Sequence, residues 1–282
     1  MTVVTASPSS MEYVRTSLHR AEGAYKKTLV LRDHGVGGFE LQLARYDEGF
    51  HASRHFHAFD QFRIGLEGPI KYGENLVLRP RMVGYFPAGT AYGPHHTDQQ
   101  ASGQPFNFAL LQYDGTGEGY HCAVSRLDEA NERLQKTGAF EKGFYQSNDG
   151  TRVEAWQASF REATGRTPVI PPAKYSAPIF MNMDAFAWKK LEGTRTQYKV
   201  LGVFGEPETR IEMLLLPAGE SVALATIEHN LVVFVIDGET SRDGQSLGRW
   251  SSAYVEANDT MELRGESPQT ELLVMKLPRF AA

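Results

Sequence analysis

Two histidines separated by a single residue lie in a glycine-bounded segment that reads GFHASRHFHAFDQFRIGLEG over residues 49–68. Its pattern is G-x5-H-x-H-x3-Q-x6-G. Side chains alternate between the two faces of a β-strand, so His55 and His57 are expected to point the same way. Two imidazoles placed like this can bind one metal ion, and Gln61 follows after a short turn as a third polar ligand. The segment therefore predicts a strand that carries a metal site.

The same spacing recurs near the C-terminus with apolar residues in place of the polar ones. Gly49 and Gly68 are 19 positions apart, as are Gly219 and Gly238. The expected ligand positions of the second copy are occupied by Ala225, Ile227, Leu231 and Met261. Only the methionine thioether is a metal ligand at all, and it is a soft one. The second copy is therefore predicted to be a packed apolar core.

A second motif follows each copy. It reads RMVGYFPAGTAYGPHH from residue 81 and WSSAYVEANDTM from residue 250. The two motifs together resemble the paired signatures of the cupin superfamily, and their repetition resembles a bicupin over most of residues 28–115 and 199–280. The resemblance implies an all-β fold of two tandem antiparallel jelly-roll β-barrels joined by a short, partly helical linker.

The expected domain organisation has four parts. They are an N-terminal arm (1–27), a metal-binding cupin domain (28–115), a linker with helices (116–175) and a second cupin domain with a degenerate site (176–282). The arm is expected to be a short helix packed on the first barrel, or a loose segment. In the linker, one helix is predicted after Ser125 and another over residues 153–164, ending at Gly165. The run 177–188 is expected to supply the first strand of the second domain.

The resemblance leaves the fourth metal ligand open. The family's second signature has histidine where this chain has Tyr92, glycine where it has Arg81, and asparagine where it has His96. Either Tyr92 occupies the ligand position, or the loop after it brings His95 or His96 into the site. We favour His96, and the alternative is that both are solvated loop histidines. The predicted metal ligands are thus His55, His57, Gln61 and His96.

These four ligands are all uncharged, so a divalent ion bound by them would keep its full charge inside the barrel. Such an ion attracts an anionic chelating substrate, for example an enolate, a phenolate or a 2-oxo acid, and acts as a Lewis acid. Fe(II) is the metal we favour because it can react with O2, and Zn, Mn or Ni are the alternatives. Gln61 is the weakest ligand of the set and could instead form a hydrogen bond beside the metal.

Two residues are predicted to act on the substrate. Arg63 lies two positions after Gln61 and should share its inward face. A buried arginine requires an anion, so Arg63 is expected to bind a substrate carboxylate, unless it forms an internal salt bridge with Glu67 or Glu40. Tyr92 is expected to act as an acid or as a hydrogen-bond donor to the substrate.

The composition limits the partners. A net charge of −5 without a basic cluster argues against nucleic acid, and no apolar run reaches the length of a membrane span. Cys122 is the only cysteine, so no intrachain disulfide is expected, a cytoplasmic protein is the default, and the thiol is interpreted as structural. Cupin barrels commonly pair through edge strands, and the resemblance therefore favours a homodimer.

The functional prediction is a metal-dependent cupin dioxygenase that acts on a small anionic aromatic or enolisable substrate in the N-terminal barrel. A non-oxidative metal-dependent lyase or isomerase is one alternative, because the fold does not decide the reaction. A small-molecule-binding bicupin without catalysis is another, which the degenerate second site would suit.

Overall fold

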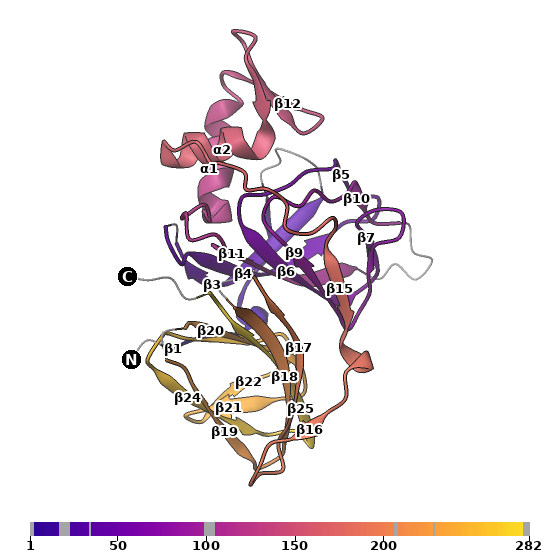
Figure 1. The fold of residues 1–282 in the computed structure, drawn as a ribbon, viewed down its shortest axis with the longest axis vertical. Helices are drawn as coiled ribbons and strands as arrows, with labels where there is room; N and C mark the ends of the chain where they lie inside the picture. Colours follow the sequence, from indigo (N-terminus) through magenta and orange to yellow (C-terminus); the bar gives the residue numbers. More distant parts are fainter. Residues whose placement is uncertain are drawn as a thin grey trace. The chain divides into compact units, whose positions relative to one another are not determined.

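The computed structural model describes residues 3–16, 23–33, 35–98, 105–205, 208–227 and 229–278. The chain divides into two compact units, which we call the N-terminal unit (residues 13–181) and the C-terminal unit (residues 1–12 and 182–282). Both units consist mainly of antiparallel strands, which confirms the all-β prediction (Figure 1). None of the helices in the described ranges is long and apolar enough to cross a membrane.

The N-terminal unit packs a large sheet against a small one. The large sheet has the order β15 (Ile179–Asn182), β9 (Met82–Phe86), β6 (Asp60–Glu67), β11 (Phe106–Tyr113), β4 (Phe39–Tyr46), β3 (Ala24–Arg32) and β2 (Val14–Arg15). The small sheet has the order β5 (His51–Ala52), β10 (His95–His96), β7 (Ile70–Lys71) and β8 (Val77–Leu78). Phe108 on β11 and Ile70 on β7 belong to one buried cluster, so the two sheets share a core.

The C-terminal unit repeats this arrangement strand for strand. Its large sheet has the order β1 (Val3–Ala6), β23 (Ser252–Val255), β20 (Leu231–Asp237), β25 (Gln269–Lys276), β18 (Thr209–Pro217), β17 (Gln197–Phe204) and β16 (Lys189–Lys190). Its small sheet has the order β19 (Ser221–Ala225), β24 (Thr260–Gly265), β21 (Thr240–Arg242) and β22 (Gln245–Leu247). The predicted tandem repeat of jelly-roll units is therefore confirmed.

The backbone conformation repeats together with the spacing. Where the family's second signature has glycine, Arg81 has a φ of 63°, and its counterpart Trp250 has a φ of 67°. The left-handed region costs an L-residue roughly 1–2 kcal/mol, so neither residue would adopt it without a constraint. The repeated element is therefore the shape of this turn, which both copies form without glycine.

Two segments differ from their predicted roles. In the described part of residues 1–27, the predicted helix is replaced by β1, the 3-10 helix η1 (Pro8–Ser10), β2 and the start of β3. β1 pairs with β23 of the C-terminal unit, and its β-branched Val-Val-Thr sequence favours a strand.

β15, expected in the second domain, instead lies beside β9 in the N-terminal sheet, and the 3-10 helix η2 (Met183–Ala185) follows it.

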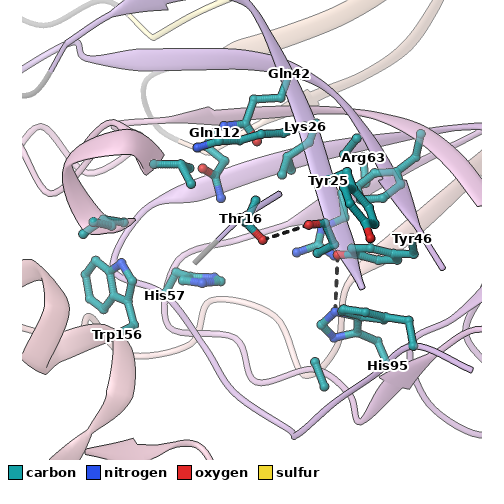
Figure 2. A pocket seen from close by; sticks show the side chains of 18 of the residues that line it. Thr16, Tyr25, Lys26, Gln42, Tyr46, His57, Arg63, His95, Gln112 and Trp156 are labelled. Atoms are coloured by element: carbon teal, nitrogen blue, oxygen red, sulfur yellow. Dashed lines mark hydrogen bonds between the residues drawn. The ribbon is translucent and has the colours of Figure 1, made fainter. Parts of the chain in front are cut away.

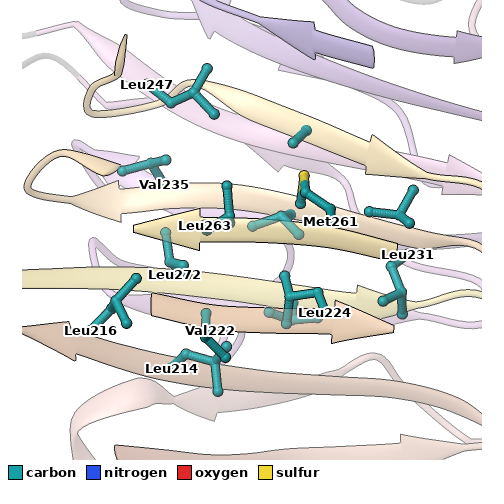
Figure 3. Packing of buried hydrophobic residues seen from close by; sticks show 14 residues of the cluster. Leu214, Leu216, Val222, Leu224, Leu231, Val235, Leu247, Met261, Leu263 and Leu272 are labelled. Atoms are coloured by element: carbon teal, nitrogen blue, oxygen red, sulfur yellow. The ribbon is translucent and has the colours of Figure 1, made fainter. Parts of the chain in front are cut away.

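The interior of the C-terminal unit is an apolar core (Figure 3). Leu231 and Met261 belong to this core, as predicted for two of the four vacant ligand positions. The other two positions are corrected: Ala225 is exposed, and the Ile227 side chain is 77% exposed. Along β19 the buried side chains are Val222 and Leu224, so the alternation of this strand is offset by one residue from the predicted frame.

Two helices lie in the N-terminal unit, as predicted for the linker. They are α1 (Val124–Leu134) and α2 (Ala155–Thr164), and a small sheet of β12 (Gly138–Glu141), β13 (Phe144–Ser147) and β14 (Arg152–Glu154) lies between them in sequence. α2 ends at Gly165, whose φ is 73°. Cys122 packs in a buried cluster with Trp156 of α2, and burial raises the pKa of the Cys122 thiol to about 11. The thiol therefore stays protonated, which supports a structural role.

Asp60, at the start of β6, makes the stability of the protein depend on pH. Its carboxylate accepts a hydrogen bond from the Ala88 backbone N–H at 2.6 Å. Burial nevertheless raises the pKa of Asp60 from 3.8 to about 6. The folded state thus holds this proton more tightly than the unfolded chain, and stability is lost as the pH rises from about 4 to about 6, by roughly 3 kcal/mol in total.

We expect Asp60→Asn to remove this loss, because an amide keeps the acceptor for Ala88 and has no charge to bury. The measurement is the free energy of unfolding in urea from pH 4 to pH 7 for both proteins. The free energy of unfolding of Asp60→Asn should rise relative to that of the wild type as the pH increases from about 4 to about 6. Parallel profiles would show that Asp60 titrates normally.

Candidate functional site

One face of the large N-terminal sheet carries a row of polar side chains. Arg63 on β6 lies opposite Leu110 on β11, and Leu110 lies opposite Gln42 on β4. Gln112 lies opposite Gln61 in the next row. Residues paired across antiparallel strands project to the same face. Gln61 and Arg63 therefore share one face of β6, as strand alternation predicts.

A cavity of about 170 Å³ lies against this face (Figure 2). Its walls include the aromatic side chains of Tyr46, Phe50, Phe59, Phe108 and Trp156. Its polar lining consists mainly of Lys26, Gln42, His55, His57, Arg63, His95, Gln112 and Asp128. The cavity is thus apolar on its sides, with both cationic and hydrogen-bonding groups facing it.

The two histidines of the motif lie side by side, with ring centroids 5.1 Å apart. His55 Nδ1 donates to the Ser53 carbonyl at 2.6 Å, so Nε2 carries the lone pair of the neutral ring. The Tyr92 hydroxyl lies 3.0 Å from this Nε2 and can donate to it. Gln61 Nε2 donates to His57 Nδ1 at 2.6 Å. The predicted residues are therefore brought together, but they are joined by hydrogen bonds.

Arg63 is the centre of this hydrogen-bond network, and all its partners are neutral. Nε and Nη2 donate to Gln61 Oε1 at 3.2 and 2.9 Å, and Nη2 also donates to the Tyr92 hydroxyl at 2.9 Å. Nη1 donates to the Tyr72 hydroxyl at 2.8 Å, and Tyr46 is a further side-chain hydrogen-bond partner of the guanidinium. Burial opposes the charge, but the hydroxyls of Tyr72, Tyr92 and Tyr46 outweigh it and raise the pKa of Arg63. The guanidinium is therefore charged.

In the described chain, Arg63 has no carboxylate partner. Glu40 accepts hydrogen bonds from the Thr28 hydroxyl and the Val124 backbone N–H. Glu67 accepts one from the Asn107 side chain. Neither forms the internal salt bridge that was the alternative for Arg63. The positive charge of a side chain that is only 4% exposed is thus left without a counter-charge.

Tyr92 occupies a supporting position. Its backbone forms a bridge with His55, and its hydroxyl contacts Arg63 and His55. It is buried and does not line the cavity, in contrast to those two residues. The structure therefore places Tyr92 where it orients the cavity-lining groups, and not where it would touch a substrate as predicted.

The structure corrects the prediction that His96 is the histidine that enters the site. His95 is buried, lines the cavity, and places Nε2 3.5 Å from the Tyr46 hydroxyl. The His96 side chain is 36% exposed, with Nε2 3.6 Å from Asp98 Oδ1. Adjacent residues of a strand point to opposite faces, so only one of the two can enter the interior. That residue is His95, and His96 faces away from the site.

The sequence matches no protein-family profile and no curated protein sequence. Solved structures do match. A Nostoc punctiforme protein provisionally described as a dioxygenase has a TM-score of 0.64 at 12% identity, over 99% of this chain and 84% of that chain. Streptomyces albus HEPD with 2-hydroxyethylphosphonate and Fe(II) bound has a TM-score of 0.58 at 14% identity, over 99% and 77%. The Escherichia coli pirin YhhW in complex with nickel(II) has a TM-score of 0.56 at 8% identity, over 99% and 100%.

The chain has the tandem cupin fold. The TM-scores of 0.56–0.64 establish the fold alone, because at identities of 8–14% the ligand and the reaction depend on the side chains of each site. The two units are thus an N-terminal cupin with a polar cavity and a C-terminal cupin with an apolar core.

The four predicted metal ligands do not come together as one set in the N-terminal cupin, because His96 faces away from the site. Among the described residues, no group of three or more His, Cys, Asp or Glu side chains could hold a metal. Gln61 Oε1 and the Tyr92 hydroxyl each accept a hydrogen bond from Arg63 Nη2 at 2.9 Å. A cation bound to either oxygen at about 2.1 Å would lie within about 5 Å of that nitrogen. At an effective dielectric constant of about 20, a divalent charge there is repelled by about 7 kcal/mol.

Most residues that line the cavity of the N-terminal cupin were not predicted, among them Lys26, Gln42, Gln112 and Trp156. These residues lie outside the histidine motif, and Lys26, Gln42 and Gln112 are on neighbouring strands of the sheet. β4 carried a usable signal, because Glu40 and Gln42 alternate with Leu41 and Leu43 in a strand that is buried along most of its length. A polar residue on a buried strand of a small barrel indicates a cavity or an internal partner. No comparable signal marks Trp156, which lies in α2.

Proposed function

We propose that the N-terminal cupin binds a small organic anion, most simply a carboxylate, beside Arg63. The observation that carries the proposal is a buried guanidinium that lines a cavity and has only neutral partners among the described residues. An uncompensated buried charge is costly, so a ligand that supplies the opposite charge is bound favourably. The guanidinium supplies both the positive charge and the N–H donors for this anion, which would replace one of the neutral hydroxyl partners.

The size of the cavity limits the ligand. An engineered apolar cavity of about 150 Å³ is known to bind benzene, so a cavity of about 170 Å³ suits a single ring or a chain of similar volume. The side chains of Phe50, Phe108 and Trp156 favour an aromatic or planar acid. For an acid of about nine non-hydrogen atoms, we expect a Kd of about 0.1–1 mM.

A metal-dependent dioxygenase acting on the same kind of anion is the second candidate. It is favoured by His55, whose Nδ1 donates to a backbone carbonyl while Nε2 faces inward, as in metal-bound histidines. Two structural neighbours that bind Fe(II) and nickel(II) also support this second candidate. In that case His55 and His57 would hold the metal, which would supply Lewis-acid or O2 chemistry.

Isothermal titration with sodium benzoate separates the two candidates. The protein is first treated with a chelator, and its metal content is measured by elemental analysis. We expect benzoate to bind the metal-free protein with a Kd of about 0.1–1 mM, unchanged by added chelator. Binding that develops only after anaerobic addition of Fe(II), with stoichiometric uptake of iron, would contradict the first candidate and support the second.

A further inference from the structure

Two buried nitrogen donors on the cavity wall have no hydrogen-bond partner among the described residues. They are Lys26 Nζ and Gln42 Nε2. Lys26 is 6% exposed and Gln42 is 3% exposed, and both side chains line the same cavity as Arg63. Buried polar groups in folded proteins are nearly always hydrogen-bonded, so two unsatisfied donors on one wall indicate a place for an acceptor.

These donors lie on β4 and β3, which are two and three strands away from β6, the strand that carries Arg63. Arg63, Leu110 and Gln42 form one row across three neighbouring strands. With strands about 4.8 Å apart, the Cα atoms of Arg63 and Gln42 are separated by about 10 Å. Lys26 is on the next strand, opposite Ala44. A molecule the size of one substituted ring can therefore reach from the guanidinium to this second pair of donors.

The charge at the second end limits what can bind there. Lys26 Nζ lies 3.4 Å from Asp128 Oδ2, and Asp128 also lines the cavity. The ammonium is thus already balanced by a carboxylate, in contrast to the guanidinium of Arg63. A second anionic group on the ligand would meet Asp128 and be repelled, whereas a hydroxyl or carbonyl oxygen would accept from Lys26 and Gln42 without this penalty.

We propose that the ligand is a small hydroxy acid or oxo acid, held by its carboxylate at Arg63 and by a neutral oxygen at Lys26 and Gln42. This inference rests on the proposed function, because it assumes that an anion binds beside Arg63. It adds the second recognition point, and it excludes simple monoacids and dicarboxylates as the preferred ligands.

The test compares benzoate, 3- and 4-hydroxybenzoate and terephthalate by isothermal titration. In the wild-type protein, the better of the two hydroxybenzoates should bind at least fivefold more tightly than benzoate, and terephthalate should bind more weakly than that hydroxybenzoate. In Gln42→Met, and independently in Lys26→Met, the ratio between the hydroxybenzoate and benzoate should fall to within about twofold. Gln146→Met, an exposed site on β13, is the matched control and should keep the wild-type ratio.

The outcomes separate this inference from the function on which it rests. Hydroxybenzoates that bind no better than benzoate, or a ratio that stays at the wild-type value in both Gln42→Met and Lys26→Met, would overturn the second recognition point and leave the anion site intact. Failure of all four acids to bind the folded wild-type protein would overturn the proposed function itself. Thermal unfolding of each variant verifies that the comparison is made on folded protein.

Discussion

Replacing Arg63 with methionine should weaken the binding of benzoate to the N-terminal cupin by about 100-fold, which is about 2.7 kcal/mol. The reason is that Arg63 supplies a buried positive charge with no carboxylate partner in the described chain, and removal of one member of a buried charged pair costs about 2–5 kcal/mol. Methionine fills a similar volume without the charge. Isothermal titration of the metal-free variant measures the change.

Two further variants make this result interpretable. Arg264→Met removes an exposed arginine of the C-terminal cupin and should leave benzoate binding unaltered. Arg63→Lys keeps the charge but cannot contact Gln61, Tyr72 and Tyr92 together, so its affinity should lie between those of the wild type and Arg63→Met. Benzoate binding by folded Arg63→Met at the wild-type level would refute the role of the guanidinium. Stronger uptake of Fe(II) by this variant would also indicate that the arginine had been repelling a metal.

Replacing Leu263 with alanine should lower the free energy of unfolding of the C-terminal cupin by about 3 kcal/mol. Leu263 is fully buried on β24, within the apolar cluster that occupies the position of the second predicted site. Removal of its side chain leaves a cavity that the surrounding strands cannot close. Urea denaturation followed by circular dichroism measures the loss.

The same variant tests whether the C-terminal cupin is a structural unit. Leu191→Ala, at a partly exposed position of the same unit, is the matched control and should change stability by no more than about 0.5 kcal/mol. Benzoate should bind Leu263→Ala with wild-type affinity under native conditions, because none of the described residues of the C-terminal cupin lines the cavity. A large loss of affinity in folded Leu263→Ala would show that the second cupin takes part in ligand binding.

The fold could be predicted because the repeated spacing marks strand ends. Gly49 and Gly219 have φ values of 75° and 76°, so corresponding turns begin at corresponding positions. The repeated spacing was a less reliable guide to which side chains point into the core and which point to solvent. Ile227 was placed one residue out of register, since spacing measured from a glycine does not report where the alternation of the next strand begins.

The residues of the site were easier to predict than their chemistry. Strand alternation correctly brought Gln61 and Arg63 to one face of β6. The partners of Arg63 depend on side chains from distant elements, such as Tyr72 beyond β7, and no local pattern links these residues. The resemblance to metal-binding cupins therefore indicated a metal, whereas the hydrogen bonds among these side chains favour an arginine-centred site.

A crystal structure of the chelator-treated protein with benzoate would show directly whether Arg63 binds the anion. We expect a carboxylate in the N-terminal cavity, with an oxygen about 3 Å from the Arg63 guanidinium and no metal at His55 and His57. A metal ion held by His55 and His57, or benzoate bound away from Arg63 while the cavity contains only solvent, would contradict it.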